Sequence, residues 1–380
     1  MPTATSDKLA PSIEPLLRSH ISRLRPYVPG KPISEVKREL GLPDDFEIDK
    51  LASNENVLGP SPAAVEAIKN AAAGIWLYPD DTCYDLKNAL ADFWELAPEN
   101  FIIGNGSDEI IHFLMLALLD AEDEIISAQP SFVQYESAAK MAGCTCKLVP
   151  LTPDGRHDLP AMQEQISEHT KMIFIANPNN PTGTVVGKQE FDEFIKSIPP
   201  HILVVLDQAY YEYVELEDSP EGIDYVRDGY NVILLHTFSK AYALAGLRVG
   251  YGLADAGLIK ALQQVRGPFN VNALSQAAAI ASLGDAEQLT RTREMNAAGK
   301  KYFYEQLDEM GIPYMPTEAN FIFLDSGLPA KEVFQELLRH GVIVRTGDPF
   351  GLPTWLRVTI GTPAMNERFI KALRIIRERA

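Results

Sequence analysis

Five short, mainly apolar runs recur along the first two thirds of the chain, and segments with helical patterns separate them. The runs lie at 124–126, 146–149, 172–176, 202–206 and 231–235. Strands that are apolar at nearly every position are typical of parallel sheets, because helices cover both faces of such sheets. The alternation predicts an α/β fold with a large domain built on a mostly parallel sheet.

The C-terminal part of the chain has a different pattern. Strand-like runs lie at 319–324, 342–345 and 356–361, and helical patterns lie at 330–339 and 364–378. Alternating elements over so short a segment indicate a smaller α+β domain.

A break separates the two patterns at 266–272, where glycine, proline and two asparagines interrupt the helical signal. The length of 380 residues suits two domains. We therefore expect an N-terminal arm at 1–55 that contributes to the small domain, a large ligand-binding domain at 56–270 and a small C-terminal domain at 271–380.

Composition excludes several classes of function. The chain has 34 Lys and Arg against 52 Asp and Glu, a net charge of −18, which disfavours binding to nucleic acid. It has no apolar run long enough to span a membrane, and its first residues lack the apolar core of a secretory signal. Three cysteines with a single Cys-x-Cys pair are weak evidence for a metal site. We expect a cytoplasmic protein without metal or membrane partners.

Polar residues gather where the predicted parallel strands end. Ser107 and Asp108, the loop 177–183, Asp207 with Tyr210, and the segment 237–240 all follow such strands. Ligands of open α/β sheets bind beyond the C-terminal ends of the strands. These residues are therefore expected to form one site.

The segment after the run 231–235 contains the candidate catalytic lysine and candidate phosphate-binding residues. Lys240 is the only lysine between Lys196 and Lys260, and apolar neighbours together with Arg248 should lower its proton affinity and make it a nucleophile. Thr237, Ser239 and Arg248 offer two hydroxyls and a guanidinium to a phosphate. A lysine able to form a Schiff base beside a phosphate site suggests pyridoxal 5'-phosphate (PLP). The alternative is a buried helix start with a snorkelling lysine.

Three further stretches allow both a ligand-binding and a structural interpretation. Gly-Asn-Gly at 104–106 leads into a helix whose N-terminus could bind phosphate, or it is a plain tight turn with Ser107 as the N-cap. The proline-rich loop 177–183 could hold an asparagine amide toward a ring, or it is a rigid turn. Asp207 needs a partner because a carboxylate at the end of a buried strand is poorly solvated. The partner is either a protonated ring nitrogen, in which case Tyr210 could reach the oxygen of the same ring, or a structural arginine.

Arg345 and Arg357 lie at the ends or starts of predicted strands of the C-terminal part, where a charge is unexpected. They could bind an anionic substrate through bidentate contacts. The alternative is a pair of charges that protects edge strands.

Taken together, these motifs resemble those of the PLP-dependent aminotransferases of fold type I, and among them the chain is similar to the histidinol-phosphate aminotransferases. The resemblance covers nearly the whole chain. Its motifs occur in order at 27–30, 51–62, 78–80, 104–109, 177–183, 207–213, 237–248 and 356–361.

The resemblance implies a role for each cofactor-binding residue. Lys240 would hold PLP covalently and move the proton at the substrate Cα, and Asp207 would keep the pyridine nitrogen protonated. Asn180 and Tyr210 would bind the ring oxygen, and Phe132 would stack on the ring. The phosphate would be bound by Ser107, Asp108, Thr237, Ser239 and Arg248, and by Tyr78 of the neighbouring subunit of a homodimer.

The resemblance also implies the substrates, L-histidinol phosphate and glutamate or 2-oxoglutarate, which react in two half-reactions with ping-pong kinetics. Arg357 would bind the glutamate carboxylate and, with Arg345 and Tyr27, the phosphate of histidinol phosphate, and Asn105 would face the substrate. The chain departs from many relatives at Gln208, where glutamate is usual, and at Val57, where proline is common.

Other functions remain open at this point. The same chemistry could serve phenylalanine or tyrosine, or a decarboxylase acting on threonine phosphate. A non-catalytic PLP-fold binding protein is disfavoured because Lys240 and Asp207 are both present. A nucleotide-binding α/β protein is disfavoured because the glycines at 104–106 lack the phosphate-loop lysine pattern.

Overall fold

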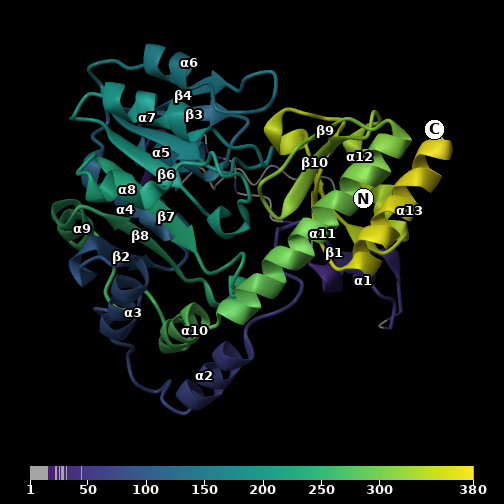
Figure 1. Cartoon of the computed structure of the whole chain (residues 1–380), viewed down its shortest axis with the longest axis horizontal. Helices are drawn as coiled ribbons and strands as arrows, with labels where there is room; N and C mark the ends of the chain where they lie inside the picture. Colours follow the sequence, from purple (N-terminus) through teal and green to yellow (C-terminus); the bar gives the residue numbers. More distant parts are fainter. Residues whose placement is uncertain are drawn as a thin grey trace.

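The apolar runs of the sequence form a seven-stranded sheet in a computed structural model, which describes residues 16–21, 24, 26, 30, 32–43 and 45–379 (Figure 1). The strand order is β2-β8-β7-β6-β5-β3-β4, and only β8 runs against its neighbours. The strands are β2 (Phe101–Gly104), β3 (Glu124–Gln129), β4 (Thr145–Pro150), β5 (Thr170–Ala176), β6 (Leu203–Asp207), β7 (Val232–Thr237) and β8 (Gly250–Ala254). The expected mostly parallel sheet is confirmed.

Helices cover both faces of this sheet, because successive residues of each strand enter opposite hydrophobic cores. Ile102 and Ile125 face one core and Ile103 and Ile126 face the other. The helices on the first face are α4 (Ser107–Leu118), α5 (Gln134–Ala142) and α9 (Ala256–Gln263). The helices whose side chains enter the second core are α2 (Pro62–Ala72), α3 (Tyr84–Trp94), α6 (Leu159–Glu164), α7 (Lys188–Ser197), α8 (Gly222–Arg227) and α10 (Ala273–Leu283), and α2 packs on α10.

The C-terminal elements pack around a hydrophobic core of their own and form a second, smaller body beside the body built on the seven-stranded sheet. Its antiparallel sheet has the order β12-β13-β10-β9, and β1 pairs in parallel with β11. The strands are β1 (Asp49–Lys50), β9 (Tyr314–Met315), β10 (Phe321–Asp325), β11 (Val342–Ile343), β12 (Arg345–Thr346) and β13 (Trp355–Thr359). The helices are α1 (Ile33–Leu40), α12 (Ala330–Arg339) and α13 (Pro363–Glu378). The expected small α+β part is confirmed.

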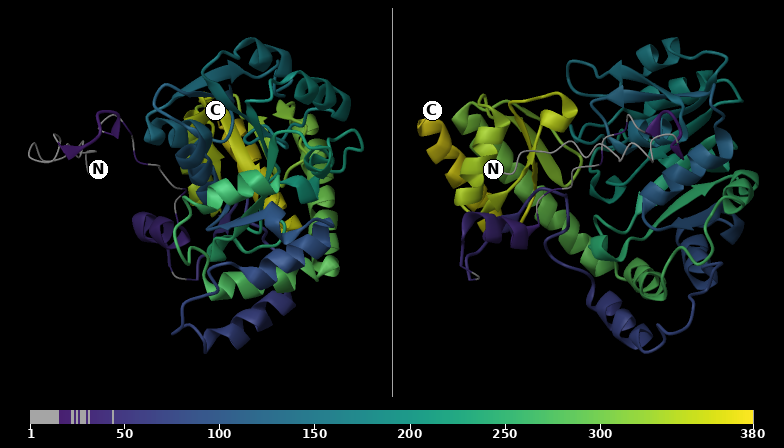
Figure 2. Two further views of the ribbon diagram at one scale, coloured as in Figure 1. Left: turned by 90° about the vertical axis from the view of Figure 1, so that its left-hand side faces the viewer. Right: turned by 180° about the vertical axis from the view of Figure 1, so that it is seen from behind.

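The long helix α11 (Ala286–Met310) joins the two bodies, which lie side by side when seen from behind (Figure 2). Short 3₁₀ helices lie at Pro98–Asn100, Tyr211–Tyr213, Ala245–Leu247 and Asp348–Phe350. Within the described residues, no helix is both long enough and apolar enough to cross a membrane.

Local sequence signals explain where the helices near the site begin. The Ser61 hydroxyl accepts a hydrogen bond of 3.1 Å from the backbone N–H of Ala63, and Pro62 is the first residue of α2. At α4 the N-cap position belongs to Gly106 rather than to Ser107, which is the first helical residue. Gly106 has φ +80°, a conformation that glycine adopts without strain.

Candidate active site

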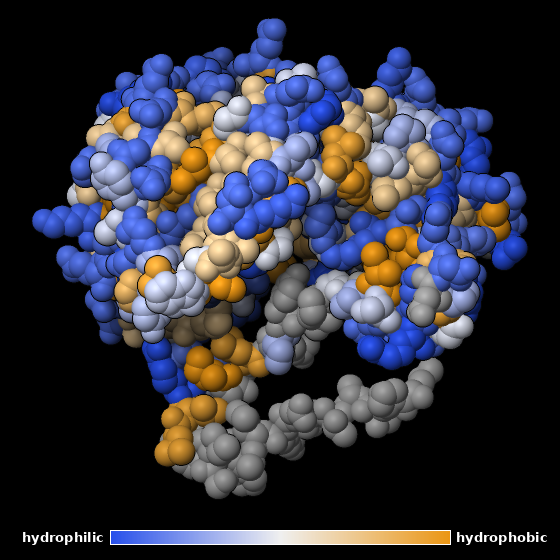
Figure 3. All heavy atoms as spheres, turned by 90° about the horizontal axis from the view of Figure 1, so that it is seen from below, coloured by the Kyte–Doolittle hydropathy of each residue, from blue (hydrophilic) through white to orange (hydrophobic). Residues whose placement is uncertain are grey.

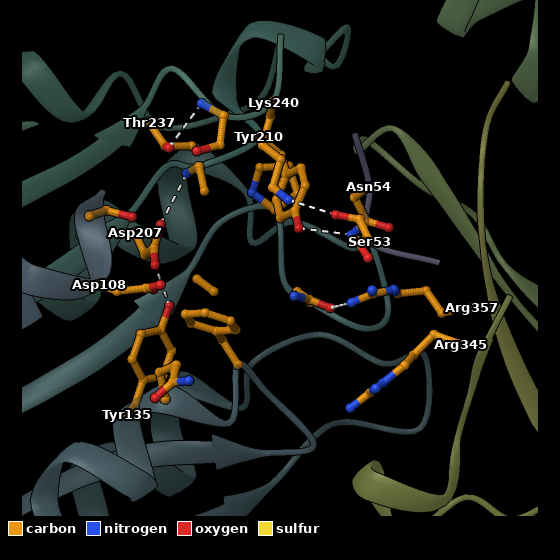
Figure 4. A pocket seen from close by; sticks show the side chains of 18 of the residues that line it. Ser53, Asn54, Asp108, Tyr135, Asp207, Tyr210, Thr237, Lys240, Arg345 and Arg357 are labelled. Carbon is orange, nitrogen blue, oxygen red and sulfur yellow. Dashed lines mark hydrogen bonds between the residues drawn. The ribbon is translucent and has the colours of Figure 1, made fainter. Parts of the chain in front are cut away.

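One cavity is lined by residues of both bodies, and most of the predicted site residues line it (Figure 4). They are Ser107, Asp108, Phe132, Asn180, Asp207, Tyr210, Thr237, Ser239, Lys240, Arg248, Arg345 and Arg357. The cavity lies at the C-terminal ends of β5, β6 and β7, as expected for a parallel sheet.

Lys240 follows β7 and points into this cavity. Its Nζ donates a hydrogen bond of 2.9 Å to the backbone carbonyl of Ser53. Burial, and next the positive charge of Arg357, lower the pKa of Lys240 to about 8. Arg248, which the sequence suggested as the main charge, contributes less than Arg357. A lysine with this pKa has an appreciable neutral, nucleophilic fraction near neutral pH.

Tyr210 lies beside Lys240, with the ring centroid 5.8 Å from the lysine Nζ. Its hydroxyl accepts a hydrogen bond of 2.9 Å from Asn54 Nδ2, and the ring packs edge-on against Phe321. Burial raises the pKa of Tyr210, so the phenol stays protonated and can donate its hydrogen into the cavity.

Asp207 ends β6 and is buried below the cavity. Its carboxylate accepts hydrogen bonds from the Tyr135 hydroxyl (2.7 Å) and the backbone N–H of Ala209 (3.0 Å). Burial raises the pKa of Asp207 to about 6, although both hydrogen bonds lower it. The described residues thus give Asp207 a hydroxyl and a backbone N–H, not the arginine that the structural interpretation required. A cationic ligand atom at Asp207 would stabilise its charged form.

The N-terminus of α4 and the loop after β7 form a cradle for an anion. Arg248 Nη1 lies 3.3 Å from Ser239 Oγ, and its Nη2 lies 3.5 Å from Asp108 Oδ2. A Cβ added at Gly106 would lie 2.4 Å from Arg248 Nη2, so only glycine allows this close approach. The free N–H groups of a helix start, a guanidinium and hydroxyls together match the requirements of a phosphate.

Two arginines enter the cavity from the smaller body (Figure 4). Arg345 and Arg357 are paired partners on the antiparallel strands β12 and β13, which places them side by side. Arg357 Nη1 donates to Asn180 Oδ1 at 2.5 Å, and Nη2 donates to the carbonyl of Ala52 at 2.7 Å. The pair forms a positive wall of the cavity that could bind an anionic group.

Two of the predicted site residues that the structure describes are not part of this cavity lining. Tyr78 is 81% exposed, and Asn105 is exposed as well. Tyr27 lies outside the described residues. Gln208 is buried and Val57 is half-buried, and neither lines the cavity.

The sequence did not assign roles to Tyr135, Ser53 and Asn54, all of which line the cavity. Tyr135 lies in the first turn of α5 and three residues after Phe132, which precedes that helix, and their ring centroids are 5.5 Å apart in an edge-on contact. Asn54 lies in the polar stretch 51–62, but its partner Tyr210 is 156 residues away. The contacts of Ser53 with Lys240 and of Asn54 with Tyr210 join segments more than 150 residues apart, so no local signal predicts them.

Comparison with known proteins identifies the family. The family model described as aminotransferase class I and II matches residues 47–373. A curated protein of Moorella thermoacetica called histidinol-phosphate aminotransferase is 54% identical over 95% of this chain and 93% of its own length. A Carboxydothermus hydrogenoformans protein called histidinol-phosphate aminotransferase 2 is 46% identical over 96% of this chain and 99% of its own length.

The fold gives a similar result. The crystal structure of histidinol-phosphate aminotransferase from Sinorhizobium meliloti, in complex with pyridoxal-5'-phosphate, aligns with a TM-score of 0.87 and 28% identity, over 96% of this chain and 98% of that one. By sequence and by fold, this chain belongs to the class I and II aminotransferase family.

Proposed function

We propose that this aminotransferase uses PLP to move an amino group between L-histidinol phosphate and 2-oxoglutarate, as a step of histidine biosynthesis. The observation that carries the choice of substrate is the Arg345–Arg357 pair, which faces the same cavity as Lys240. A substrate with a phosphate at one end and an amine at the other fits that arrangement. The names of the relatives from Moorella and Carboxydothermus support it.

The residues of the cavity fit PLP. Its aldehyde needs a lysine with a lowered pKa, its pyridine nitrogen needs a buried carboxylate, and its phosphate needs a cradle of donors. Lys240, Asp207 and the helix start at Ser107 supply these three groups within one cavity. Thr237, Ser239, Arg248 and Asp108 complete the phosphate side.

When bound, PLP supplies an aldehyde that takes up the amino group and a ring that delocalises the electron pair left at the substrate Cα. Lys240 would take the proton from the substrate Cα and return it on the cofactor side. Its lowered pKa leaves part of the amine neutral near pH 7, as a general base requires.

The other cavity residues orient and polarise the ring. Asp207 would keep the pyridine nitrogen protonated, and hydrogen bonds from Tyr135 and Ala209 fix the direction of its carboxylate. Tyr210 and Asn180 would hold the ring oxygen, and Phe132 would hold the ring face. Arg357 would bind the carboxylate of glutamate. Arg345 and Arg357 would bind the phosphate of histidinol phosphate together with Tyr27, and Asn105, which lies outside the cavity lining, would contact the substrate.

We also propose a homodimer in which Tyr78 reaches the phosphate in the neighbouring site. Ile75, Trp76, Leu77 and Tyr78 are consecutive, large and between 58% and 81% exposed. Consecutive exposed apolar side chains of this size favour a protein interface. Figure 3 shows a face on which apolar side chains lie among hydrophilic ones at the surface.

We propose the predicted division into an arm at 1–55, a large PLP-binding domain at 56–270 and a small domain at 271–380, although α10 of the last segment packs into the core of the large domain. The pairing of β1 with β11 supports the assignment of the arm to the small domain. The cytoplasm is the proposed location, since PLP and glutamate are available there and Cys83, Cys144 and Cys146 are free thiols.

The test is a single-turnover experiment on the purified PLP form, followed by absorbance. L-histidinol phosphate, glutamate, phenylalanine and tyrosine are added separately. We expect rapid conversion to the pyridoxamine form with histidinol phosphate and glutamate, and slow conversion with the two aromatic amino acids.

The other outcomes each identify an alternative. Faster conversion with phenylalanine or tyrosine would assign the enzyme to aromatic amino acids. Release of carbon dioxide from O-phospho-L-threonine would indicate a decarboxylase. Absence of the absorbance of lysine-bound PLP would overturn the cofactor assignment itself.

A further inference from the structure

Tyr78 lies against one other aromatic ring, that of Phe269. The two ring centroids are 4.6 Å apart and the planes are inclined by 22°, a stacked arrangement. Tyr78 is 81% exposed and Phe269 is 42% exposed. An exposed tyrosine side chain ordinarily samples several rotamers, and a stacked neighbour reduces that freedom.

Phe269 has a conformation that a bulky residue rarely adopts. Its φ is +56°, in the left-handed region. Such a residue persists only when its surroundings hold it there. Neighbouring groups must therefore hold the backbone of Phe269 in this conformation.

Asp81, three residues after Tyr78, holds Phe269 in place. Its carboxylate accepts a hydrogen bond from the backbone N–H of Phe269. The same carboxylate binds Arg266 through two contacts, Nη1 to Oδ1 at 3.0 Å and Nη2 to Oδ2 at 2.7 Å. The Arg266 side chain is only 10% exposed, and bidentate contacts of this kind are rigid. The loop that carries Tyr78 and the loop that carries Phe269 are thus clamped together.

The second loop is also fixed to the cradle of its own subunit. Asn270 Nδ2 donates to Glu109 Oε2 at 2.6 Å, and the same oxygen accepts the backbone N–H of Asn105 at 2.7 Å. Asn105 lies in the turn that leads to the start of α4. The loop that carries Phe269 is therefore held by Asp81 on one side and by Glu109 on the other.

We propose that Phe269 is a positioning residue for Tyr78, held by the Arg266–Asp81 pair so that the tyrosine hydroxyl is aimed at the cofactor phosphate in the partner subunit's site. The inference rests on the proposed function, because it requires a homodimeric PLP enzyme. Stacking restricts the tyrosine before it binds, so less conformational entropy is lost when its hydroxyl contacts the phosphate. Each subunit thus positions a binding group for the other subunit's site.

Hybrid dimers test whether Phe269 of one subunit affects PLP binding in the site of the other subunit. Lys240→Ala removes the reactive lysine from one subunit, so that only the other subunit retains a site with lysine-bound PLP. In the first hybrid, Phe269→Ala is placed in the lysine-free subunit. In the second hybrid, Phe269→Ala is placed in the subunit that keeps Lys240. The measured quantity is the PLP dissociation constant of the lysine-bearing site, followed by its absorbance.

The first hybrid should bind PLP about three- to tenfold more weakly than a hybrid without the Phe269 change, and the second should bind PLP normally. Phe269→Tyr in place of Phe269→Ala keeps the stacked ring and should restore the affinity. Phe269→Gly removes the ring and relieves the backbone strain, so it should weaken PLP binding as Phe269→Ala does without endangering the fold.

Equal affinity in the two hybrids, or a loss confined to the second, would overturn the proposal. The wild-type protein separates this failure from a failure of the proposed function. If the wild type is a dimer with lysine-bound PLP and the hybrids do not differ, the positioning role alone is wrong. If the wild type is monomeric or lacks lysine-bound PLP, both proposals fail.

Discussion

The Tyr135 hydroxyl donates a hydrogen bond of 2.7 Å to the Asp207 carboxylate, and both side chains are buried. Tyr135 comes from α5 and Asp207 from the end of β6, which are brought together by the packing of that helix on the sheet. The contact lowers the pKa of Asp207 against the larger effect of burial, which raises it to about 6. Tyr135 therefore helps to keep the carboxylate ionised at neutral pH.

Tyr135→Phe should weaken PLP binding. Loss of one hydrogen bond to a charged acceptor costs about 1.5–3 kcal/mol, which corresponds to a PLP dissociation constant raised about tenfold or more. The pKa of Asp207 should also rise, so activity should be lost at a higher pH on acidification than in the wild type. PLP titration and a pH–rate profile measure both effects. Tyr251→Phe, which removes another buried hydroxyl outside the cavity lining, is the control and should leave PLP affinity unchanged.

Lys240→Ala should abolish transamination and the absorbance of lysine-bound PLP while leaving the fold intact, because in the proposed mechanism Lys240 supplies both the covalent attachment and the proton transfer at Cα. Circular dichroism, absorbance and a coupled assay measure the three properties. Lys260→Ala, at an exposed position of α9, should behave like the wild type. Turnover by Lys240→Ala at the wild-type rate would refute the central assignment.

The capture of PLP by the apoprotein should accelerate as the pH rises through about 8, because only the neutral amine of Lys240 is nucleophilic. The same shift affects stability. The folded pKa lies below the usual 10.5, so between about pH 8 and 10.5 the unfolded chain binds more protons and the stability of the apoprotein rises with pH. Below pH 8 both states hold the proton and this contribution is constant.

Stopped-flow absorbance gives the capture rate at each pH, and denaturant unfolding gives the stability. Arg357→Gln removes the neighbouring positive charge and should move the midpoint of the rate profile to higher pH. A wild-type midpoint above pH 10 would show that Lys240 is not perturbed.

Arg345→Ala should lower kcat/KM for histidinol phosphate about a hundredfold, since removal of a charged partner of a buried phosphate costs a few kcal/mol. The reaction with phenylalanine should change little, because this substrate has no phosphate. Steady-state kinetics with both substrates provide the comparison. Arg345→Lys keeps the charge but not the bidentate fork, and an intermediate loss is expected. Equal losses with both substrates would exclude a role in phosphate recognition.

Much of the architecture follows from local sequence. The apolar runs predict β3, β5, β6 and β7 to within a few residues, because strands buried on both faces are apolar at successive positions. Helix α12 begins and ends as predicted at 330 and 339. The periods of 2 and 3.6 residues are properties of short segments and need no knowledge of distant contacts.

The sequence determined a mostly parallel α/β sheet and placed a lysine, a carboxylate and candidate phosphate-binding groups at the strand ends, because each of these follows from a short motif and a rule of sheet topology. Only the tertiary structure decided which groups act on them. Ser53 contacts Lys240 and Asn54 contacts Tyr210 across more than 150 residues, and Arg357 exceeds Arg248 in its effect on Lys240. The burial of Lys240 and its distances to these groups determine the contacts and the pKa, and they arise only when the two bodies pack together.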